Sequence, residues 1–346
     1  MEFIKPNTNF DFVGKRRIAY GVSLSLILLS MLSLVFHGGP KYGIDFAGGT
    51  VIQIKFPSSV VINDIKSGLA SIGLENTTIQ TFGDPRDFEY LIRTEKSIQT
   101  DDKFSEQVKS SIQKTTGTDP DIRRIEMVGP QVGKDLQEKA LFAIYYSMLF
   151  IAIYISGRFE FRWLACATIA IVLMGGVYLL SELSIPMAIL TALALIITLV
   201  LFWVLNLKYA MGAIVALIHD VTITVGCFSL LGKEFSLPII AAILSIMGYS
   251  LNDTIIVYDR IRENLRKHPK NALEVTINRS VNETLSRTIL TSGLTMLAVI
   301  SLFIFGGGII HDFALAMLVG IVVGTYSSIY VASPILLAWQ DVGKKK

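Results

Sequence analysis

Long apolar runs separated by short polar connections make up most of this chain, apart from one polar stretch near its beginning. A helix needs roughly 20 apolar residues to cross a bilayer, and eight runs approach or reach that length. They predict spans at Ile18–Phe36, Leu141–Ile155, Trp163–Leu180, Met187–Leu205, Ala210–Leu231, Leu237–Tyr258, Ile289–Phe305 and Phe313–Trp339. The sequence therefore predicts an α-helical polytopic membrane protein with about eight transmembrane helices.

The polar stretch, residues 37–139, has the periodicity of a folded α+β domain. Alternating or β-rich residues predict four strands, and helical spacing of apolar residues predicts two helices between them. In chain order these are Thr50–Phe56, Val61–Ile72, Thr77–Phe82, Asp87–Arg93, Asp101–Thr115 and Ile122–Val128. The β-α-β-β-α-β order is that of a ferredoxin-like unit, and about 95 residues suffice for one small core.

The distribution of Lys and Arg predicts the orientation in the membrane, because cytoplasmic loops carry an excess of both. Basic residues cluster at 15–17, in the loop 259–286 and at 344–346, whereas the short connections on the opposite side carry one Lys and no Arg. Both termini are therefore expected in the cytoplasm and residues 37–139 outside it. The predicted organisation is a first span in 1–36, this extracytoplasmic domain, a second span and cytoplasmic loop in 140–162, a helical hairpin in 163–207, and four further helices in 208–346.

Composition excludes several functional classes. Mean hydropathy is +0.56 and 52% of residues are hydrophobic, above the level of a soluble domain. The net charge of +3 is small and no stretch interleaves basic with aromatic residues, so we expect no nucleic-acid partner. Cys166 and Cys227 lie in apolar runs without metal-ligand spacing. The polar domain shows no nucleophile–base pair, metal cluster or phosphate loop, and we expect no enzyme activity, metal site or bound cofactor.

Asp253 is the first candidate functional residue, because it lies within an almost wholly apolar run that begins near Ser236. An ionised carboxylate in hydrocarbon costs about 2.5–3.5 kcal/mol on insertion scales. Asn252 and Thr254 flank it. Two interpretations remain open: a structural polar contact between helices, or a proton carrier.

His219, Asp220 and Arg287 are the other ionisable candidates within predicted spans. His219 and Asp220 lie about ten residues, roughly 15 Å, into theirs. Neighbouring residues point about 100° apart on a helix, so the two are expected to face different partners, as structural donors or as a proton relay. Arg287 and Asp253 lie at similar depths, roughly 6–9 Å from the inner ends of consecutive spans, which predicts a level, switchable pair.

Asp45, Gly48 and Gly49 follow the first span on the outer side. The carboxylate is expected either to bond loop amides at a turn or to serve as a hinge or docking residue. A lone glycine pair more often marks a turn or close backbone packing than a ligand cradle.

Several motifs in this order resemble those of the SecD/SecF family of protein-export membrane proteins, which belongs to the resistance-nodulation-division superfamily. They are Tyr42–Thr50, His219-Asp220, Gly248–Arg260 with its continuation to Asn264, Ser286–Thr288 and Gly324–Tyr330. The resemblance implies a bacterial inner-membrane protein that uses the proton motive force and has no cofactor. It implies that Asp253 and Arg287 are a proton-path pair, and we add Asp220, His219 and Asn252 to this path because of their positions in the spans. It also favours a hinge or docking role for the segment with Asp45, Gly48 and Gly49.

The resemblance also implies the partners. These are a SecD-like subunit, the SecYEG channel, a YajC-like subunit, the translocating unfolded polypeptide and membrane lipid. The expected role is to couple proton flow to movement of the extracytoplasmic domain. The alternative is a proton-driven small-molecule exporter of the resistance-nodulation-division type, although a single outer domain of this size argues against it. An aspartyl intramembrane protease is disfavoured because the sequence lacks a Gly-x-Gly-Asp motif.

One departure from the family pattern is the added pair of spans within 163–207. Family members normally have six spans, and the loop that corresponds to Arg158–Arg162 leads directly into the helix with His219-Asp220. The added pair carries no Lys, Arg, Asp or His within hydrocarbon. An even number of added spans preserves the orientation of all that follows, so we predict a peripheral helical hairpin.

Overall fold

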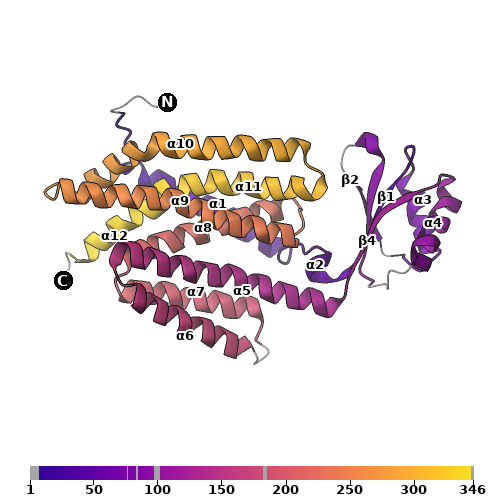
Figure 1. Cartoon of the computed structure of the whole chain (residues 1–346), viewed down its shortest axis with the longest axis horizontal. Coiled ribbons are helices and arrows are strands. Elements are labelled where there is room, and N and C mark those ends of the chain that lie inside the picture. The colour runs from indigo at the N-terminus through magenta and orange to yellow at the C-terminus, as the bar shows by residue number, and fades with distance from the viewer. Residues whose placement is uncertain (1–7, 76, 83–84, 97–101, 182–184, 344–346) are drawn as a thin grey trace.

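The computed structural model describes residues 8–75, 77–82, 85–96, 102–181 and 185–343. A long helical bundle forms one part of the molecule, and a small α+β domain lies beyond one end of it (Figure 1). Both ends of the chain lie at the opposite end of the bundle (Figure 1). We call the two ends of the bundle the domain side and the terminal side.

Eight helical segments in the described part of the chain are long and apolar enough to cross a membrane. This confirms the predicted fold class. The helices are α1 (Arg16–Phe36), α5 (Pro130–Ile155), α6 (Trp163–Ser181), α7 (Met187–Val204), α8 (Lys208–Leu230), α9 (Leu237–Lys267), α10 (Leu273–Phe305) and α11 (Gly308–Ser327), which α12 (Ser333–Gly343) continues. Single π-helical segments follow α5 at Ser156–Glu160 and α11 at Ser328–Ala332.

Three of these helices are longer than their apolar runs. α5 begins eleven residues before the predicted Leu141, α9 continues nine beyond Tyr258, and α10 begins sixteen before Ile289. The additional turns of α9 and α10 are polar and pair with each other, through Arg260–Glu283 at 2.6 Å and Asn264–Ser280 at 3.0 Å. Hydropathy could not reveal these turns, because their stability comes from ion pairs beyond the apolar part of the bundle.

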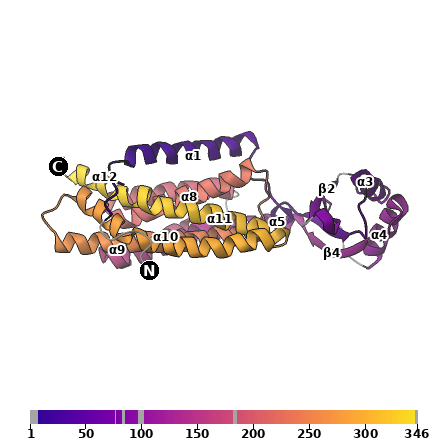
Figure 2. The same cartoon turned by 90° about the horizontal axis from the view of Figure 1, so that it is seen from above.

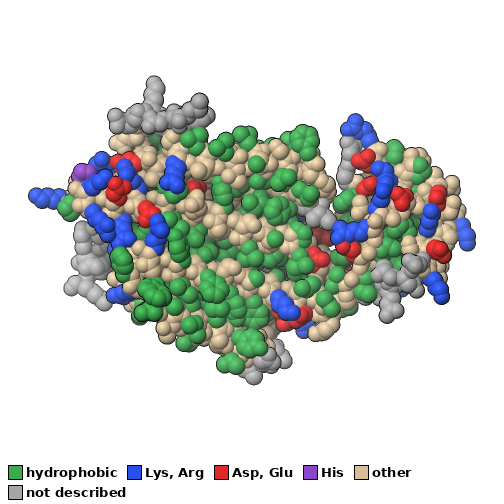
Figure 3. Space-filling model, in the orientation of Figure 1, with side chains coloured by type: hydrophobic (Ala, Val, Ile, Leu, Met, Phe, Trp, Pro, Cys, Tyr) green, Lys and Arg blue, Asp and Glu red, His purple; other side chains and the backbone are tan. Residues whose placement is uncertain are grey.

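The surface of the bundle separates apolar from charged residues. Charged side chains gather toward the terminal side and on the α+β domain, while the face between them is largely hydrophobic (Figure 3). α8 is the most buried of the eight candidate spans. Its buried small residues, Ala210, Gly212, Ala213 and Ala216, allow neighbouring helices to approach closely.

α1 lies against one side of the bundle, where it packs mainly on α8 (Figure 2). Small residues form this seam: Ser33 and Ser229 share a hydrogen bond of 2.8 Å, and Ser30 abuts Gly226. The segment before α1 is held on the terminal side by α10. There Asn278 accepts from the Phe12 amide at 2.8 Å, and Asn282 accepts from the Phe10 amide at 2.8 Å.

The hairpin of α6 and α7 packs on α5 at the edge of the bundle (Figure 1). It shares a separate apolar cluster with α5, formed by Tyr145, Leu149, Ala170, Val177, Met187, Leu190 and Ala194. Hydrogen bonds hold its two ends together: Arg162 donates to the Leu205 carbonyl at 3.0 Å, and the Tyr209 amide donates to Glu160 at 2.9 Å. The chain therefore leaves and rejoins the rest of the bundle at one place.

The α+β domain has the predicted ferredoxin-like arrangement. Its elements are β1 (Gly49–Lys55), α3 (Ile62–Ala70), β2 (Thr77–Phe82), β3 (Glu89–Thr94), α4 (Asp102–Thr116) and β4 (Asp121–Val128), with a short α2 (Ile44–Ala47) before β1 and a 3₁₀ turn at Pro85–Asp87. The sheet is antiparallel with order β2-β3-β1-β4. The described boundaries lie within two residues of those predicted, and the predicted start at Asp101 lies outside the described residues.

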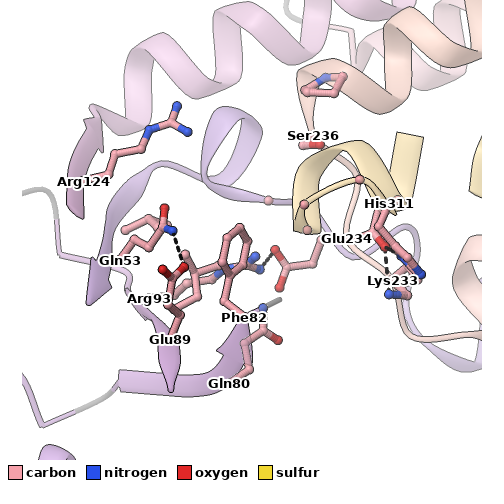
Figure 4. Close-up of a pocket in the computed structure, with 18 of the residues that line it drawn as sticks. Gln53, Gln80, Phe82, Glu89, Arg93, Arg124, Lys233, Glu234, Ser236 and His311 are labelled. Carbon is pink, nitrogen blue, oxygen red and sulfur yellow. Dashed lines mark hydrogen bonds and ion pairs between the residues drawn. The ribbon is translucent and has the colours of Figure 1, made fainter. Parts of the chain in front are cut away.

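A core of its own holds the domain together. Ile52 pairs with Ile92 on β3 and Ile125 on β4, and α3 and α4 cover this face of the sheet with Ile65, Leu69, Val108 and Ile112. The other face of the sheet carries Gln53, Arg93 and Arg124 and borders a groove toward the bundle (Figure 4).

Candidate functional site

His219 and Asp220 form a buried pair in the middle of α8. His219 Nδ1 lies 2.9 Å from Asp220 Oδ1, so the two side chains bond each other. Each also faces a different part of the bundle, as their angular separation predicts. His219 Nε2 lies 3.1 Å from the Ser23 hydroxyl of α1, and Asp220 faces α9 and α11.

Two serine hydroxyls donate to the second oxygen of Asp220. Ser250 of α9 lies 2.5 Å from Oδ2, and Ser327 of α11 lies 2.9 Å from it. All three residues are buried. A buried carboxylate needs polar partners. The two hydrogen bonds to Asp220 therefore link α8 to both α9 and α11 at one place.

Asp253 occupies a second polar site, one helical turn along α9 from Ser250. It is buried and accepts a hydrogen bond from Ser292 of α10 at 3.1 Å. Thr325 of α11 donates in turn to Ser292 at 2.9 Å. Ser250 and Asp253 are three residues apart on α9, and Thr325 and Ser327 are two apart on α11. The two carboxylates therefore belong to adjoining hydroxyl networks that share two helices.

Arg287 is exposed on α10 and lies on a different level from Asp253. The antiparallel register is set by Arg260 with Glu283, Asn264 with Ser280 and Asp253 with Ser292. Arg287 is five residues from Ser292, roughly 7.5 Å along the helix. Counting residues from the ends of the apolar runs predicts that Asp253 and Arg287 are level. The structure differs because α9 and α10 extend beyond these runs and pair in another register.

Among the described residues, no hydrogen bond or ion pair joins Asp253 to Arg287, although Arg287 is near enough for its charge to act on the carboxylate. Asn252 is exposed beside Asp253 and turned away from the hydroxyl network. The structure thus brings together His219, Asp220 and, one turn away, Asp253. It leaves Arg287 and Asn252 on the outside of this chain.

Asp45 lies where the α+β domain meets the bundle. Its carboxylate accepts from the Leu237 amide at 2.8 Å and so caps the start of α9. The preceding backbone pairs with the loop between α8 and α9, with Gly43 donating to the Phe235 carbonyl at 2.6 Å and Phe235 to the Lys41 carbonyl at 2.7 Å. Asp45 therefore bonds the first amide of a helix 192 residues away, and not a loop amide in its own turn. The bond joins the segment before the sheet to the bundle.

Gly48 and Gly49 allow a close backbone approach at this junction. Both have positive φ, +77° and +123°, which favours glycine. A Cβ on Gly48 would lie 2.8 Å from the Pro130 Cα, and one on Gly49 would overlap the Thr94 carbonyl. Gly48 thus allows close packing on the start of α5, and Gly49 allows it on the end of β3.

A groove of about 1010 Å³ separates the open face of the sheet from the bundle (Figure 4). Arg93 of β3 reaches across it to form an ion pair with Glu234, which also pairs with Lys41 at 3.4 Å. Burial lowers the pKa of the Arg93 guanidinium, and the nearby Asp312 carboxylate partly offsets this effect. Lys233 binds Asp312 at 2.8 Å on the bundle side of the groove.

Sequence reasoning missed the hydroxyl groups that surround both carboxylates. Ser250 could have been found, because it precedes Asp253 by one turn on the same helix face. Ser23 and Ser292 come from distant parts of the chain, and nothing in their local pattern distinguishes them from other polar residues in apolar helices. Tyr326 lies in the Gly324–Tyr330 motif, but the motif alone does not show what its hydroxyl bonds. The Arg93–Glu234 contact is equally invisible, because both residues resemble ordinary surface charges.

Two family models match this chain. "Protein export membrane protein SecD/SecF, C-terminal" matches residues 107–185 and 180–342, and "SecD/SecF GG Motif" matches residues 33–57. The second match contains Asp45 and the glycine pair. The matches to the first model include both buried carboxylates and the hairpin.

Curated relatives and solved structures agree with these matches. The chain is 41% identical to the protein translocase subunit SecF of Magnetococcus marinus, over 100% of this chain and 97% of that protein. It is 38% identical to the SecF of Calditerrivibrio nitroreducens, over 100% and 99%. The crystal structure of SecDF from Thermus thermophilus, a translocon-associated membrane protein, has 31% identity and a TM-score of 0.68. It matches 97% of this chain, which spans only 39% of that longer chain.

Proposed function

The chain belongs to the SecD/SecF family as a translocase subunit of the Sec machinery, and we propose that it couples the proton motive force to movement of its α+β domain. This movement would promote polypeptide translocation across the bacterial inner membrane. In this proposal the terminal side of the bundle faces the cytoplasm and residues 37–139 lie outside it. The basic residues near both termini support that orientation.

The observation that carries the proposal is the pair of buried carboxylates in adjoining hydroxyl networks. Asp220 and Asp253 lie in apolar helices, where ionisable groups are costly and typically functional. Hydroxyls can donate to an ionised carboxylate and can accept from a protonated one, so these networks suit either state. One charge moved through about 180 mV supplies on the order of 4 kcal/mol, enough to bias a two-state domain movement.

α9 provides a direct connection between the proton site and the domain. It carries Asp253 in its middle, and Asp45 caps its first turn on the domain side. Glu234, which pairs with Arg93 of the sheet, lies three residues before the helix begins. Because a helix is stiff along its axis, a shift at Asp253 would reach the place where the domain docks.

The proposed partner within the membrane is a SecD-like subunit. Arg287 and Asn252 are exposed on this chain, although each lies in a candidate span. Facing lipid would be costly for an arginine, so a neighbouring protein surface is expected there. A SecD-like subunit would supply that surface and bring a partner toward Arg287. The SecYEG channel, a YajC-like subunit and the translocating polypeptide complete the proposed assembly.

The test is proton-driven export in membrane vesicles that contain Asp253→Asn at a protein level matched to wild type. Asparagine keeps the size and hydrogen bonding but cannot ionise, so we expect assembly with the partner and loss of proton-dependent stimulation. Arg287→Lys should retain partial activity, because it keeps the charge and loses the planar geometry. Asp135→Asn, an exposed carboxylate paired with Lys139, is the control and should behave as wild type.

Two other results would count against the proton-carrier role. Normal stimulation by well-assembled Asp253→Asn would exclude it. A purely structural hydrogen bond between Asp253 and Ser292 would instead show mainly as lower stability, by about 1–3 kcal/mol, and as reduced abundance in the membrane.

A further inference from the structure

A continuous series of hydrogen bonds connects Asp220 with the terminal end of α1. Asp220 Oδ1 lies 2.9 Å from His219 Nδ1, and His219 Nε2 lies 3.1 Å from the Ser23 hydroxyl. The Ser23 hydroxyl donates to the Tyr326 hydroxyl at 3.2 Å, and Tyr326 donates to the Ala19 carbonyl at 2.7 Å.

The direction of donation can be worked out from the far end of the series. A carbonyl only accepts, so the single hydroxyl proton of Tyr326 is used on Ala19. Tyr326 must then accept from Ser23, which uses the single proton of Ser23. Ser23 therefore accepts from His219, and His219 Nε2 carries a proton.

This assignment fixes the protonation of the pair. With Nε2 protonated, the contact between Nδ1 and Asp220 holds one more proton, either on the carboxyl or on the imidazole. The pair is thus a neutral imidazole with a carboxylic acid, or an imidazolium with a carboxylate. In both forms every donor between them and Ala19 points toward the terminal side.

We propose that Ser23 and Tyr326 form a proton relay that releases protons from the His219–Asp220 pair at the terminal side of the bundle. The Asp220 proton moves to Nδ1 as the Nε2 proton moves to Ser23. The Ser23 proton passes to Tyr326, and the Tyr326 hydroxyl breaks its bond to the Ala19 carbonyl and gives its proton to water. One proton departs for each one taken from Asp220. The starting arrangement returns when Asp220 takes up a new proton, the hydroxyls rotate and the histidine exchanges its tautomer.

The position of the relay suits this direction. Ala19 lies three residues beyond Arg16, roughly 4.5 Å along α1, at the end that the proposed orientation puts in the cytoplasm. Tyr326 is half-buried there and has Tyr330 beside it. The His219 ring stacks on the Tyr326 ring at 6.0 Å, which holds the groups in line. The relay rests on the proposed proton coupling and adds two residues from α1 and α11 to it.

The decisive comparison is Ser23→Thr against Ser23→Val, measured as proton flux through the full chain with its partner in dye-loaded vesicles. The two side chains have almost the same shape, so any strain is common to both and only the hydroxyl differs. We expect Thr to sustain flux and Val to reduce it about 100-fold, the low end for a positioned proton-transfer group. Equal flux in the two variants would overturn the relay.

Two further measurements keep the relay testable if position 23 tolerates neither residue. Tyr326→Phe should reduce flux in the same way, while Ser33→Ala should not, because Ser33 bonds Ser229 elsewhere on the same seam. Nitrogen-15 magnetic resonance should find His219 Nε2 protonated in the wild type. An unprotonated Nε2 would refute the donor assignment regardless of any transport result.

Failure of the relay and failure of proton coupling give different outcomes. If Asp253→Asn abolishes flux while Ser23→Val and Tyr326→Phe leave it intact, the relay is wrong and the coupling stands. If Asp253→Asn leaves flux intact, the coupling is wrong, and the nitrogen-15 result then decides the donor assignment alone.

Discussion

At the scale of single residues, hydroxyl side chains form the polar interior of this membrane protein. Many serines and threonines here bond a carbonyl one turn back on their own helix, as Ser245 does with Ala241. Ser250, Ser292 and Ser327 instead point between helices to a carboxylate. Each such contact removes an unsatisfied buried oxygen that would otherwise cost about 1–3 kcal/mol.

Gly49→Ala should destabilise the protein more than Gly117→Ala does. Both glycines have positive φ, so alanine is strained at either position, by about 1–3 kcal/mol. Only at Gly49 would the new methyl group also overlap the backbone, at Thr94, whereas Gly117 faces open space. Thermal unfolding of the purified full chain measures the difference. Equal losses at the two positions would contradict the close approach that we describe.

The sequence predicted individual carboxylates well and their partners poorly. Asp220 and Asp253 can be found from the sequence alone, because each is an ionisable residue within an apolar run. The partner of Asp253 depends on the register of α9 against α10, which polar turns beyond the apolar run determine. A shift of a few residues replaces Arg287 by Ser292 at the level of Asp253. No local pattern contains that information.

At the scale of elements, apolar runs predicted which helices exist, and the remaining details came from their contacts. The six elements β1, α3, β2, β3, α4 and β4 of the α+β domain followed from periodicity, because buried strands and amphipathic helices have distinct repeats. The way the two ends of the α6–α7 hairpin are held together could not be predicted from periodicity. It depends on hydrogen bonds that join Arg162 and Glu160 to residues more than 40 positions away.

Deleting Trp163–Leu205 with a short join should leave insertion, orientation and assembly with a SecD-like subunit largely intact. The hairpin begins and ends at one place, it adds an even number of spans, and lipid can cover the apolar α5 surface that it leaves. Accessibility of tags at both termini reports orientation, and copurification reports assembly.

Deleting Trp163–Ser181 alone is the matched control for this experiment. It removes one span and should reverse the orientation preference of everything after it. If the longer deletion inserts correctly but loses all proton-dependent stimulation, the hairpin belongs to the mechanism and is more than a peripheral addition.

At the scale of the whole molecule, one loop joins two parts with separate cores. The loop between α8 and α9 receives the Asp45 segment through its backbone and Arg93 through Glu234. The groove beside it leaves most of the sheet face uncovered (Figure 4). The domain also meets the bundle at the start of α5, directly after β4, and at Gly308 of α11, which lies against the Phe82 ring at the end of β2. Movement of the domain would therefore have to change contacts at both edges of the sheet.

Charge reversal at Arg93 and Glu234 should show how much this contact orients the domain. Arg93→Glu and Glu234→Arg each place like charges together, so each should change the distance between spin labels on α4 and α6. The double variant restores opposite charges and should recover the wild-type distance, with a coupling of about 0.5–3 kcal/mol in stability.

The control for the charge reversal is Arg124→Glu combined with Glu126→Arg. These residues form an exposed pair within β4, so the exchange should leave the spin-label distance unchanged. A double variant at Arg93 and Glu234 that stays displaced would show that the ion pair does not set the orientation.

The asparagines that hold the segment before α1 have a consequence for how the chain is made. Phe10 and Phe12 bond residues 272 and 266 positions later, on α10. Ribosomes add about 5–20 residues per second, so these partners emerge roughly 15–50 s after the segment itself. The beginning of the protein therefore waits undocked through most of its own synthesis. Its capture by Asn278 and Asn282 can follow only after the first part of α10 has been made, before α11 completes the bundle.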